Sequence, residues 1–184
     1  MKKANLVTLG KASVAEIIVK KSRFIASACP VENEQEAINW INQVKKKHSQ
    51  SSHNVFAYVI NEQVQHYSDD GEPSGTAGRP VLEVIKHKGL SHTAVVVTRF
   101  FGGILLGAGG LVRAYTDATV QAIEKAGVVE KALYRELRLT LGYQWLGLIK
   151  YELENAGGRR IETTYEQDVN IRVYVKPGNY RGAV

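Results

Sequence analysis

Two short stretches of the sequence concentrate residue types that can bind ions or small ligands. The first, SDDGEPSGTAGRPV at residues 68–81, holds three acids, three glycines and two prolines beside one arginine. Asp69, Asp70 and Glu72 could coordinate Mg²⁺ or act as acids and bases, and they could equally accept hydrogen bonds from backbone amides of their own turn. Because glycine permits sharp bends and proline fixes its own backbone angle, this mixture indicates a rigid loop rather than a flexible linker.

The second stretch, TRFFGGILLGAGGLVRAY at residues 98–115, joins a predicted strand to a predicted helix. Its glycines are Gly102, Gly103, Gly107, Gly109 and Gly110. Free amides at a helix N-terminus bind anions, and glycine lets a phosphate come close to the backbone, so Arg99 and Arg113 could complete an anion cradle. The stretch matches neither a Walker loop nor the dinucleotide-binding fingerprint. Close packing of a helix on a sheet would explain the glycines equally well.

The other candidates are a lysine run and the histidines. Lys45, Lys46 and Lys47, followed by His48, could attract phosphates, and they also complement the dipole at a helix C-terminus. His53 opens a predicted strand, where it could cap, lie at the surface or line a site. No metal-ligand spacing and no nucleophile elbow is visible. We therefore expect no metal, no cofactor and no catalytic residue, and a binding protein rather than an enzyme.

The composition is that of a globular protein in a reducing compartment. The chain has 184 residues, of which 44% are hydrophobic and 23% are charged, and Cys29 is its single cysteine. Its start lacks the hydrophobic stretch of a signal peptide, and no apolar run is long enough for a membrane span. The net charge of +6 allows an anionic partner without naming one. We expect a cytoplasmic protein.

Hydrophobic periodicity predicts the elements that would position these residues. The predicted strands cover residues 13–20, 23–30, 54–60, 64–68 and 92–100, the last one central and buried on both faces. The predicted helices follow Asn33 as an N-cap, run from residue 81 to a stop at Gly89, and run from about 109 to 126. Both stretches described above thus connect a strand to a helix.

The chain begins a second β-α-β-β pattern after Gly127, and we predict a domain boundary that separates residues 1–134 from residues 135–184. The pattern places a helix after residue 143 and two strands joined at about Glu166–Gln167. A split β-α-β sandwich would add a further helix and strand, so we expect this domain to be incomplete.

The motifs HNVFAYVI, DDGEPSGTAGRPVLEVI and VVVTRFFGGILLGAGGLVRAY, in this order, resemble the YigZ/IMPACT family over nearly the whole chain. The resemblance implies an α+β protein whose N-terminal β-α sandwich is similar to domain IV of elongation factor G and to GHMP kinases. It also implies a ferredoxin-like C-terminal domain similar to domain V of elongation factor G. The implied function is regulation of translation, by binding RNA, the ribosome or a translation-associated protein. The kinases of related fold leave a Mg²⁺-dependent enzyme that binds nucleotides or phosphates as the alternative.

The resemblance also gives the expected binding surface. Its residues are His53, Asp69, Asp70, Glu72, Arg79, Arg99, Gly102, Gly103, Gly107, Gly109, Gly110 and Arg113. With the lysine run of the charge pattern added to the two loops, the residues expected to contact nucleic acid are Lys45, Lys46, Lys47, Arg99 and Arg113. We expect the two loops to lie close together, with the arginines opposite the acids. An ion pair between Arg79 and one of the acids could fix the first loop.

Overall fold

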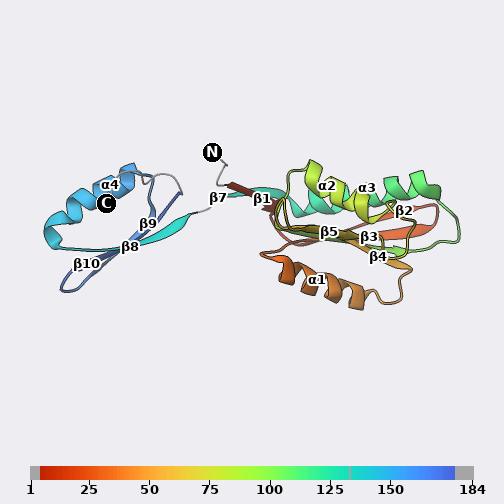
Figure 1. The fold of residues 1–184 in the computed structure, drawn as a ribbon, viewed down its shortest axis with the longest axis horizontal. Coiled ribbons are helices and arrows are strands. Elements are labelled where there is room, and N and C mark those ends of the chain that lie inside the picture. The colour runs from red at the N-terminus through yellow and green to blue at the C-terminus, as the bar shows by residue number, and fades with distance from the viewer. Residues whose placement is uncertain (1–4, 133, 177–184) are drawn as a thin grey trace. The chain divides into compact units, whose positions relative to one another are not determined.

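The computed structural model describes residues 5–132 and 134–176, and these fall into two units. One unit comprises residues 7–130, and the other is made mainly by the chain from residue 131 onward. Both units combine helices with antiparallel strands (Figure 1), so the predicted α+β class and its two-part organisation are confirmed.

The first unit contains a five-stranded sheet in the order β2-β3-β6-β4-β5. Its strands are β2 (Ser13–Val19), β3 (Ser22–Pro30), β4 (His53–Val59), β5 (Gln65–Ser68) and β6 (Thr93–Phe100). Each of them was predicted within two residues, and β6 is central and buried, as expected from its continuous apolar run. A strand that the sequence analysis did not anticipate, β1 (Asn5–Leu9), pairs with β7 (Val128–Ala132).

The helices of this unit form in the predicted segments, and two of them begin earlier in the chain than predicted. In α1 (Glu34–Lys47), the Asn33 side chain accepts a hydrogen bond from the Glu36 amide. The next helix, α2 (Gly78–His87), begins before Pro80 rather than after it, because proline is tolerated in a first turn. The third, α3 (Gly107–Ala126), also begins two residues earlier than predicted.

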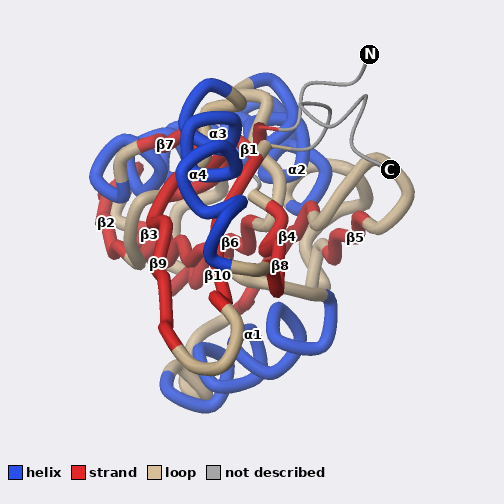
Figure 2. Tube along the Cα trace, turned by 90° about the vertical axis from the view of Figure 1, so that its left-hand side faces the viewer, coloured by secondary structure: helices blue, strands red, loops and turns tan. Residues whose placement is uncertain are grey.

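The helices cover the two faces of the five-stranded sheet unequally. Figures 1 and 2 show α2 and α3 on one face and α1 alone on the other. A helix is about 10 Å wide and strands lie about 4.8 Å apart, so one helix covers about two strands. Since α1 packs on β4 and β6, the same face of β2 and β3 is left open. Val14 and Ile18 are accordingly 48% and 70% exposed there.

The second unit has the predicted β-α-β-β order. It consists of β8 (Arg135–Leu141), a 3-10 turn (Tyr143–Trp145), α4 (Leu146–Asn155), β9 (Arg159–Tyr165) and β10 (Val169–Val175). The sheet order β8-β10-β9 is that of the first three strands of a split β-α-β sandwich. The expectation of a missing helix and strand concerns residues after 176, which lie outside the described part of the chain.

No helix within the described residues is long and apolar enough to cross a membrane.

Candidate functional site

The acidic loop, residues 69–77 between β5 and α2, is held together by Asp69. Its Oδ1 accepts hydrogen bonds from the amides of Ala77 (3.1 Å) and Gly78 (2.8 Å), and its Oδ2 accepts one from Gly75 (2.9 Å). The carboxylate therefore caps the start of α2 from nine positions away and complements the dipole of that helix. Both oxygens of Asp69 are thus engaged with the backbone of the loop itself.

Asp70 connects the acidic loop to β4 and fixes the orientation of His53. Its Oδ2 accepts a 2.6 Å hydrogen bond from the Asn54 amide, and its Oδ1 lies 3.3 Å from Lys45 Nζ. The backbone carbonyl of Asp70 lies 2.8 Å from His53 Nδ1. A carbonyl oxygen can only accept, so Nδ1 carries a hydrogen, and in the tautomer with this single hydrogen Nε2 holds the lone pair.

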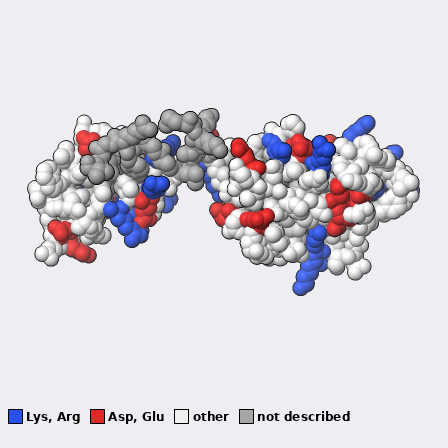
Figure 3. Space-filling view, in the orientation of Figure 1, with Lys and Arg blue, Asp and Glu red and all other residues white. Residues whose placement is uncertain are grey.

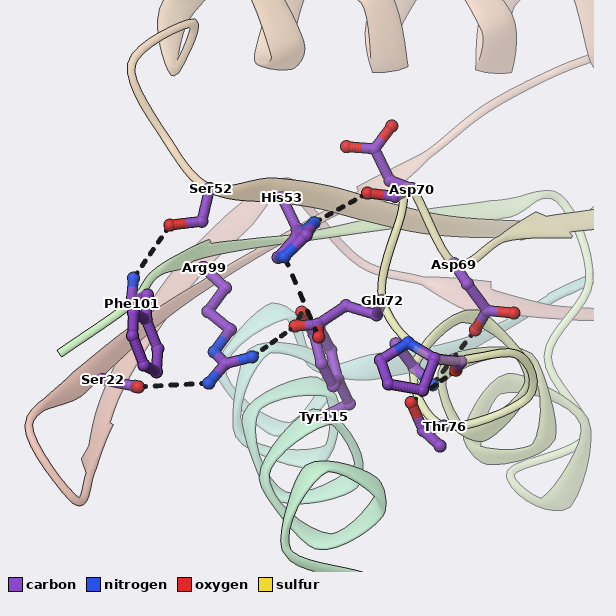
Figure 4. Close-up of polar contacts among 12 residues, drawn as sticks. Ser22, Ser52, His53, Asp69, Asp70, Glu72, Thr76, Arg99, Phe101 and Tyr115 are labelled. Atoms are coloured by element: carbon purple, nitrogen blue, oxygen red, sulfur yellow. Dashed lines mark hydrogen bonds and ion pairs between the residues drawn. The ribbon is translucent and has the colours of Figure 1, made fainter. Parts of the chain in front are cut away.

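Glu72 is the centre of a buried polar network that joins the acidic loop to β6 and α3 (Figure 4). Its side chain is 4% exposed, and its Oε1 accepts hydrogen bonds from Arg99 Nη1 and from the Tyr115 hydroxyl, both at 2.7 Å. Burial, together with the hydrogen bond to Glu72, raises the pKa of Tyr115 well above its ordinary value of 10. Arg99 Nη2 also donates to Ser22 Oγ at 3.3 Å, which ties the network to β3.

Aromatic rings enclose the guanidinium of Arg99. Its central carbon lies 5.4 Å from the ring centroids of both Phe24 and Phe101. Arg99 Nε is buried and has no hydrogen-bond partner among the described residues. The rings supply a cation–π contact on a side chain that is 6% exposed. Arg99 is thus a structural cation, held by Glu72 and the rings, rather than a cation on the surface.

The glycine-rich loop, residues 101–106 between β6 and α3, packs against the turn between β2 and β3. A side chain at Gly102 would come within 2.1 Å of the Lys21 backbone, so only glycine fits at that position. The Gly102 amide donates to Ser22 Oγ at 3.2 Å. The same serine hydroxyl therefore contacts both Arg99 and the glycine-rich loop, which fixes the loop relative to the network.

The two loops lie together and enclose a cavity of about 440 Å³, here called the loop cavity. The two loops were predicted from the sequence to lie close together. The cavity is lined by His53, Glu72, Arg99, Phe101, Gly107 and Ala108, among others. It therefore combines a buried ion pair with the first turn of α3, whose start is not capped by any side chain of the described residues.

The predicted arginines do not all reach this cavity. Arg99 does, and it is Arg99 rather than Arg79 that pairs with an acid of the loop. Arg79 is exposed on α2 and lines a separate shallow pocket. Arg113 is exposed on the face of α3 opposite Gly107 and Leu111. The predicted cradle of Arg99 and Arg113 is therefore not formed.

The five predicted glycines differ in what they do. Gly102 allows close packing, and Gly103 and Gly107 have positive φ angles of 83° and 71°. Gly109 and Gly110 lie in the first turn of α3, and a side chain at Gly109 would meet no atom within 4 Å. Packing and backbone conformation thus account for part of the glycine content, and Gly109 is left without a structural reason.

The predicted lysine run does not form one surface. Lys45 Nζ contacts Asp70 and lies 4.7 Å from the ring centroid of Phe56. Lys46 is exposed, whereas Lys47 lines a groove beside α1. The three lysines therefore point to three different surroundings.

This groove, here called the α1–β2 groove, lies over the part of the sheet that α1 leaves open and has a volume of about 790 Å³. Its basic and aromatic lining residues are Lys11, Arg23, Trp40, Lys47, His48 and Lys125. Glu16 is the acid in its lining and forms a 2.7 Å ion pair with Arg23. Burial, and then the charges of Lys47 and Arg23, lower the pKa of His48. Elsewhere basic and acidic side chains are interspersed in the view of Figure 3.

Family comparisons agree with the order of motifs along the chain. Residues 20–123 match the model of the Impact N-terminal domain, and residues 139–180 match a domain of unknown function, DUF1949. The chain is 46% identical over 171 residues to the IMPACT family member YvyE of Bacillus subtilis (strain 168), covering 92% of this chain and 79% of YvyE. The chain belongs to the IMPACT family.

Other relatives extend this result. The IMPACT family member YigZ of Escherichia coli (strain K12) is 35% identical over 159 residues, covering 84% of this chain and 78% of YigZ. A solved hypothetical protein has 32% identity and a TM-score of 0.68, covering 94% of this chain and 85% of that chain. The two-domain translational regulator Yih1 has a TM-score of only 0.37 at 23% identity, covering 63% of this chain and 46% of Yih1. Its role therefore carries no argument about this chain.

Sequence reasoning missed several participants in these sites, among them Ser22, Tyr115 and Lys125. Ser22 was assigned only to a turn, Tyr115 was assigned no role in the network, and Lys125 was read as part of a helix. In each case the partner lies far along the chain: Ser22 contacts Arg99, Tyr115 contacts Glu72, and Lys125 lines a groove with Lys11. Nothing in the local pattern around these residues indicates such contacts.

Proposed function

We propose that this IMPACT family member is a non-enzymatic binding protein of the translation apparatus that contacts RNA, free or on the ribosome, through the α1–β2 groove. The observation that carries the proposal is the composition of the groove. Four lysines and arginines line it, with His48 and the ring of Trp40, against the single acid Glu16.

The chemistry of the groove suits a single-stranded ribonucleic acid. Lysine and arginine neutralise phosphates and release counterions, and an aromatic ring offers a stacking surface for a base. Glu16 is already paired with Arg23, so it repels a phosphate chain less than a free carboxylate would. The lowered pKa of His48 favours a neutral ring near pH 7, which is suited to stacking.

The alternative of a Mg²⁺-dependent enzyme has less support from the acidic loop. The carboxylates of Asp69 and Asp70 already accept hydrogen bonds from backbone amides, and a metal would compete for the same oxygens. Those bonds hold the loop and the start of α2 in place. The geometry therefore favours a structural role for both aspartates.

RNA binding measured across a salt series tests the proposal. We expect the wild-type chain to bind a single-stranded oligoribonucleotide with an affinity that falls steeply with salt. The double variant Lys11→Glu, Lys47→Glu should bind at least tenfold more weakly, and its log–log salt slope should be lower by about 1.4, since each lost phosphate contact removes about 0.7.

The control is Lys86→Glu, Lys88→Glu, which makes the same change of charge on and just after α2, on the opposite face of the sheet. This control variant should retain most of the wild-type affinity for RNA and most of the salt slope. Equal losses in the two double variants would contradict binding at the groove. Capture of a translation protein without any binding of RNA or ribosomes would contradict the RNA proposal itself.

A further inference from the structure

The loop cavity contains two hydrogen-bond acceptors that face each other without a donor between them. Glu72 Oε1 accepts two hydrogen bonds, whereas no described residue donates a hydrogen bond to Oε2. The atom found near Oε2 is His53 Nε2, at 3.9 Å, which is too long for a hydrogen bond. In the tautomer that donates from Nδ1 to the Asp70 carbonyl, Nε2 carries a lone pair and is also an acceptor. This pair of atoms is complementary to a ligand that donates.

The charges around this pair favour a hydroxyl donor over a cation. Arg99 already neutralises Glu72 at 2.7 Å, and the start of α3 adds the partial positive charge of a helix N-terminus. An ammonium group would therefore gain less from Glu72 than it would from a carboxylate without a cationic partner. A neutral diol, which carries one O–H donor for each acceptor, can satisfy both without adding charge.

Another part of the cavity lining suits an anion. Gly107 and Ala108 line it, and no side chain of the described residues caps the start of α3, so the first amides of this 20-residue helix lack a side-chain acceptor. A helix N-terminus alone does not define a ligand-binding site. Here it adjoins a carboxylate that is 4% exposed and has one unpaired oxygen.

The remaining walls are apolar. Pro73, Phe101, Leu105, Leu106 and Leu111 line the cavity, and Phe101 and Leu105 are 48% and 81% exposed at its rim. A volume of about 440 Å³ is within the range of small-ligand sites. The cavity thus offers, side by side, acceptors for a diol, donors for an anion, and a ring on which a flat group can stack.

We propose that the loop cavity binds one ribonucleotide unit. The ribose 2′- and 3′-hydroxyls donate one to Glu72 Oε2 and the other to His53 Nε2, the phosphate accepts from the first amides of α3, and the base lies against Phe101. The unit is either a free ribonucleoside monophosphate or the 3′-terminal residue of an RNA chain, since both of these keep two free ribose hydroxyls. The site is separate from the α1–β2 groove, so this proposal can be tested independently of the RNA-binding function proposed above.

The test compares ribose with deoxyribose on the unmodified protein, so it needs no variant that has to fold. Calorimetric titration with adenosine 5′-monophosphate and with its 2′-deoxy analogue should give an affinity at least tenfold higher for the ribonucleotide. Loss of a hydroxyl removes the donor to one of the two acceptors in the cavity. Adenosine without phosphate should also bind at least tenfold more weakly. Equal affinities for ribose and deoxyribose, or no binding at millimolar concentration, would overturn the proposal.

Variants then locate the site. His53→Ala should abolish the preference for ribose, whereas His87→Ala, which removes an exposed histidine of α2 outside the loop cavity, should preserve it. The groove variant Lys11→Glu, Lys47→Glu should bind adenosine 5′-monophosphate as the wild-type chain does. Loss of nucleotide binding in that variant would assign the ligand to the groove and contradict the loop cavity.

The same titration with a short oligoribonucleotide and its deoxy counterpart distinguishes the two sources of the ligand. A ribose preference in both the oligonucleotide and the mononucleotide indicates the 3′-terminal residue of an RNA chain. A preference confined to the mononucleotide indicates a free nucleotide.

Discussion

The loop cavity and the α1–β2 groove each contain an arginine–glutamate pair at 2.7 Å, and the two pairs differ in their access to water. In the cavity, the side chains of Arg99 and Glu72 are 6% and 4% exposed. In the groove, those of Arg23 and Glu16 are 51% and 42% exposed. The interaction between exposed charges is screened by water and salt, whereas a buried charge that loses its partner is strongly destabilising.

For the two proposed binding sites, this difference predicts two kinds of recognition in one unit. The polar groups of the cavity belong to the buried network around Glu72, whose disruption would destabilise the fold. These groups are therefore already fixed in position when a ligand binds. The long side chains of the groove can rearrange around a ligand, which suits a flexible anionic chain. Specific recognition is therefore expected at the cavity and salt-dependent affinity at the groove.

Removal of the arginine from each pair should separate the two regions most clearly. Arg99→Ala should lower the free energy of unfolding by about 3–5 kcal/mol, because Glu72 stays buried without its cation. Arg23→Ala should cause no measurable change, since Glu16 then faces water. Urea denaturation of the two variants measures both effects.

A double variant sharpens this prediction. Replacement of both partners, Arg99→Met with Glu72→Leu, should restore part of the stability lost in Arg99→Ala, because no buried charge is then left unpaired. Similar small losses for Arg99→Ala and Arg23→Ala would show that burial does not separate the two pairs.

The second prediction concerns the packing that holds the cavity in place. Gly102→Ala should destabilise the protein by about 2–3 kcal/mol, since the added carbon would lie 2.1 Å from the Lys21 backbone. Gly109→Ala is the matched control in the same region. It meets open space in the first turn of α3 and should raise stability by about 0.5–1 kcal/mol. Equal effects of the two changes would contradict the close approach at Gly102.

The third and smallest effect is expected at Tyr115. Tyr115→Phe should cost about 1–2 kcal/mol, because Glu72 loses one of its two donors. The folded state raises the pKa of Tyr115 above 10, so the unfolded chain releases this proton first and stability falls as the pH rises above 10. Tyr58, whose pKa burial and Glu34 raise to about 12, contributes in the same direction.

The phenylalanine variant should therefore lose stability less steeply than the wild-type chain above pH 10, with the contribution of Tyr58 retained. Thermal unfolding at several pH values between 8 and 11 measures the slopes. Parallel curves for the two proteins would contradict a raised pKa at Tyr115.

The sequence predicted the loop cavity better than the groove because the cavity is built from continuous segments. The acids and glycines of residues 68–81 and 98–115 are neighbours along the chain, and turn chemistry alone marks both stretches as rigid loops. The sequence did not indicate which of the three acids of the loop lines the cavity. Asp69 and Asp70 bond to nearby backbone, and only the position of β6 selects Glu72 as the partner of Arg99.

The groove could not be predicted in this way. Lys11, Trp40 and Lys125 are far apart in the sequence and meet because α1 covers only two of the strands on its face. Within the lysine run, the direction of each side chain depends on its place around the helix, which separates Lys45 from Lys47. The same dependence on distant partners explains why Ser22 and the pairing of β1 with β7 went unnoticed.

Mapping the contact surface of RNA by nuclear magnetic resonance tests the central claim most directly. A short single-stranded oligoribonucleotide is added at low salt to the isotope-labelled chain of 20.3 kDa, and amide and indole shifts are followed. The account predicts that the largest changes fall on the groove, at the Trp40 indole and the amides of Lys11, Lys47 and Lys125. Changes confined to α2 or to the second unit, or no change at all, would contradict it.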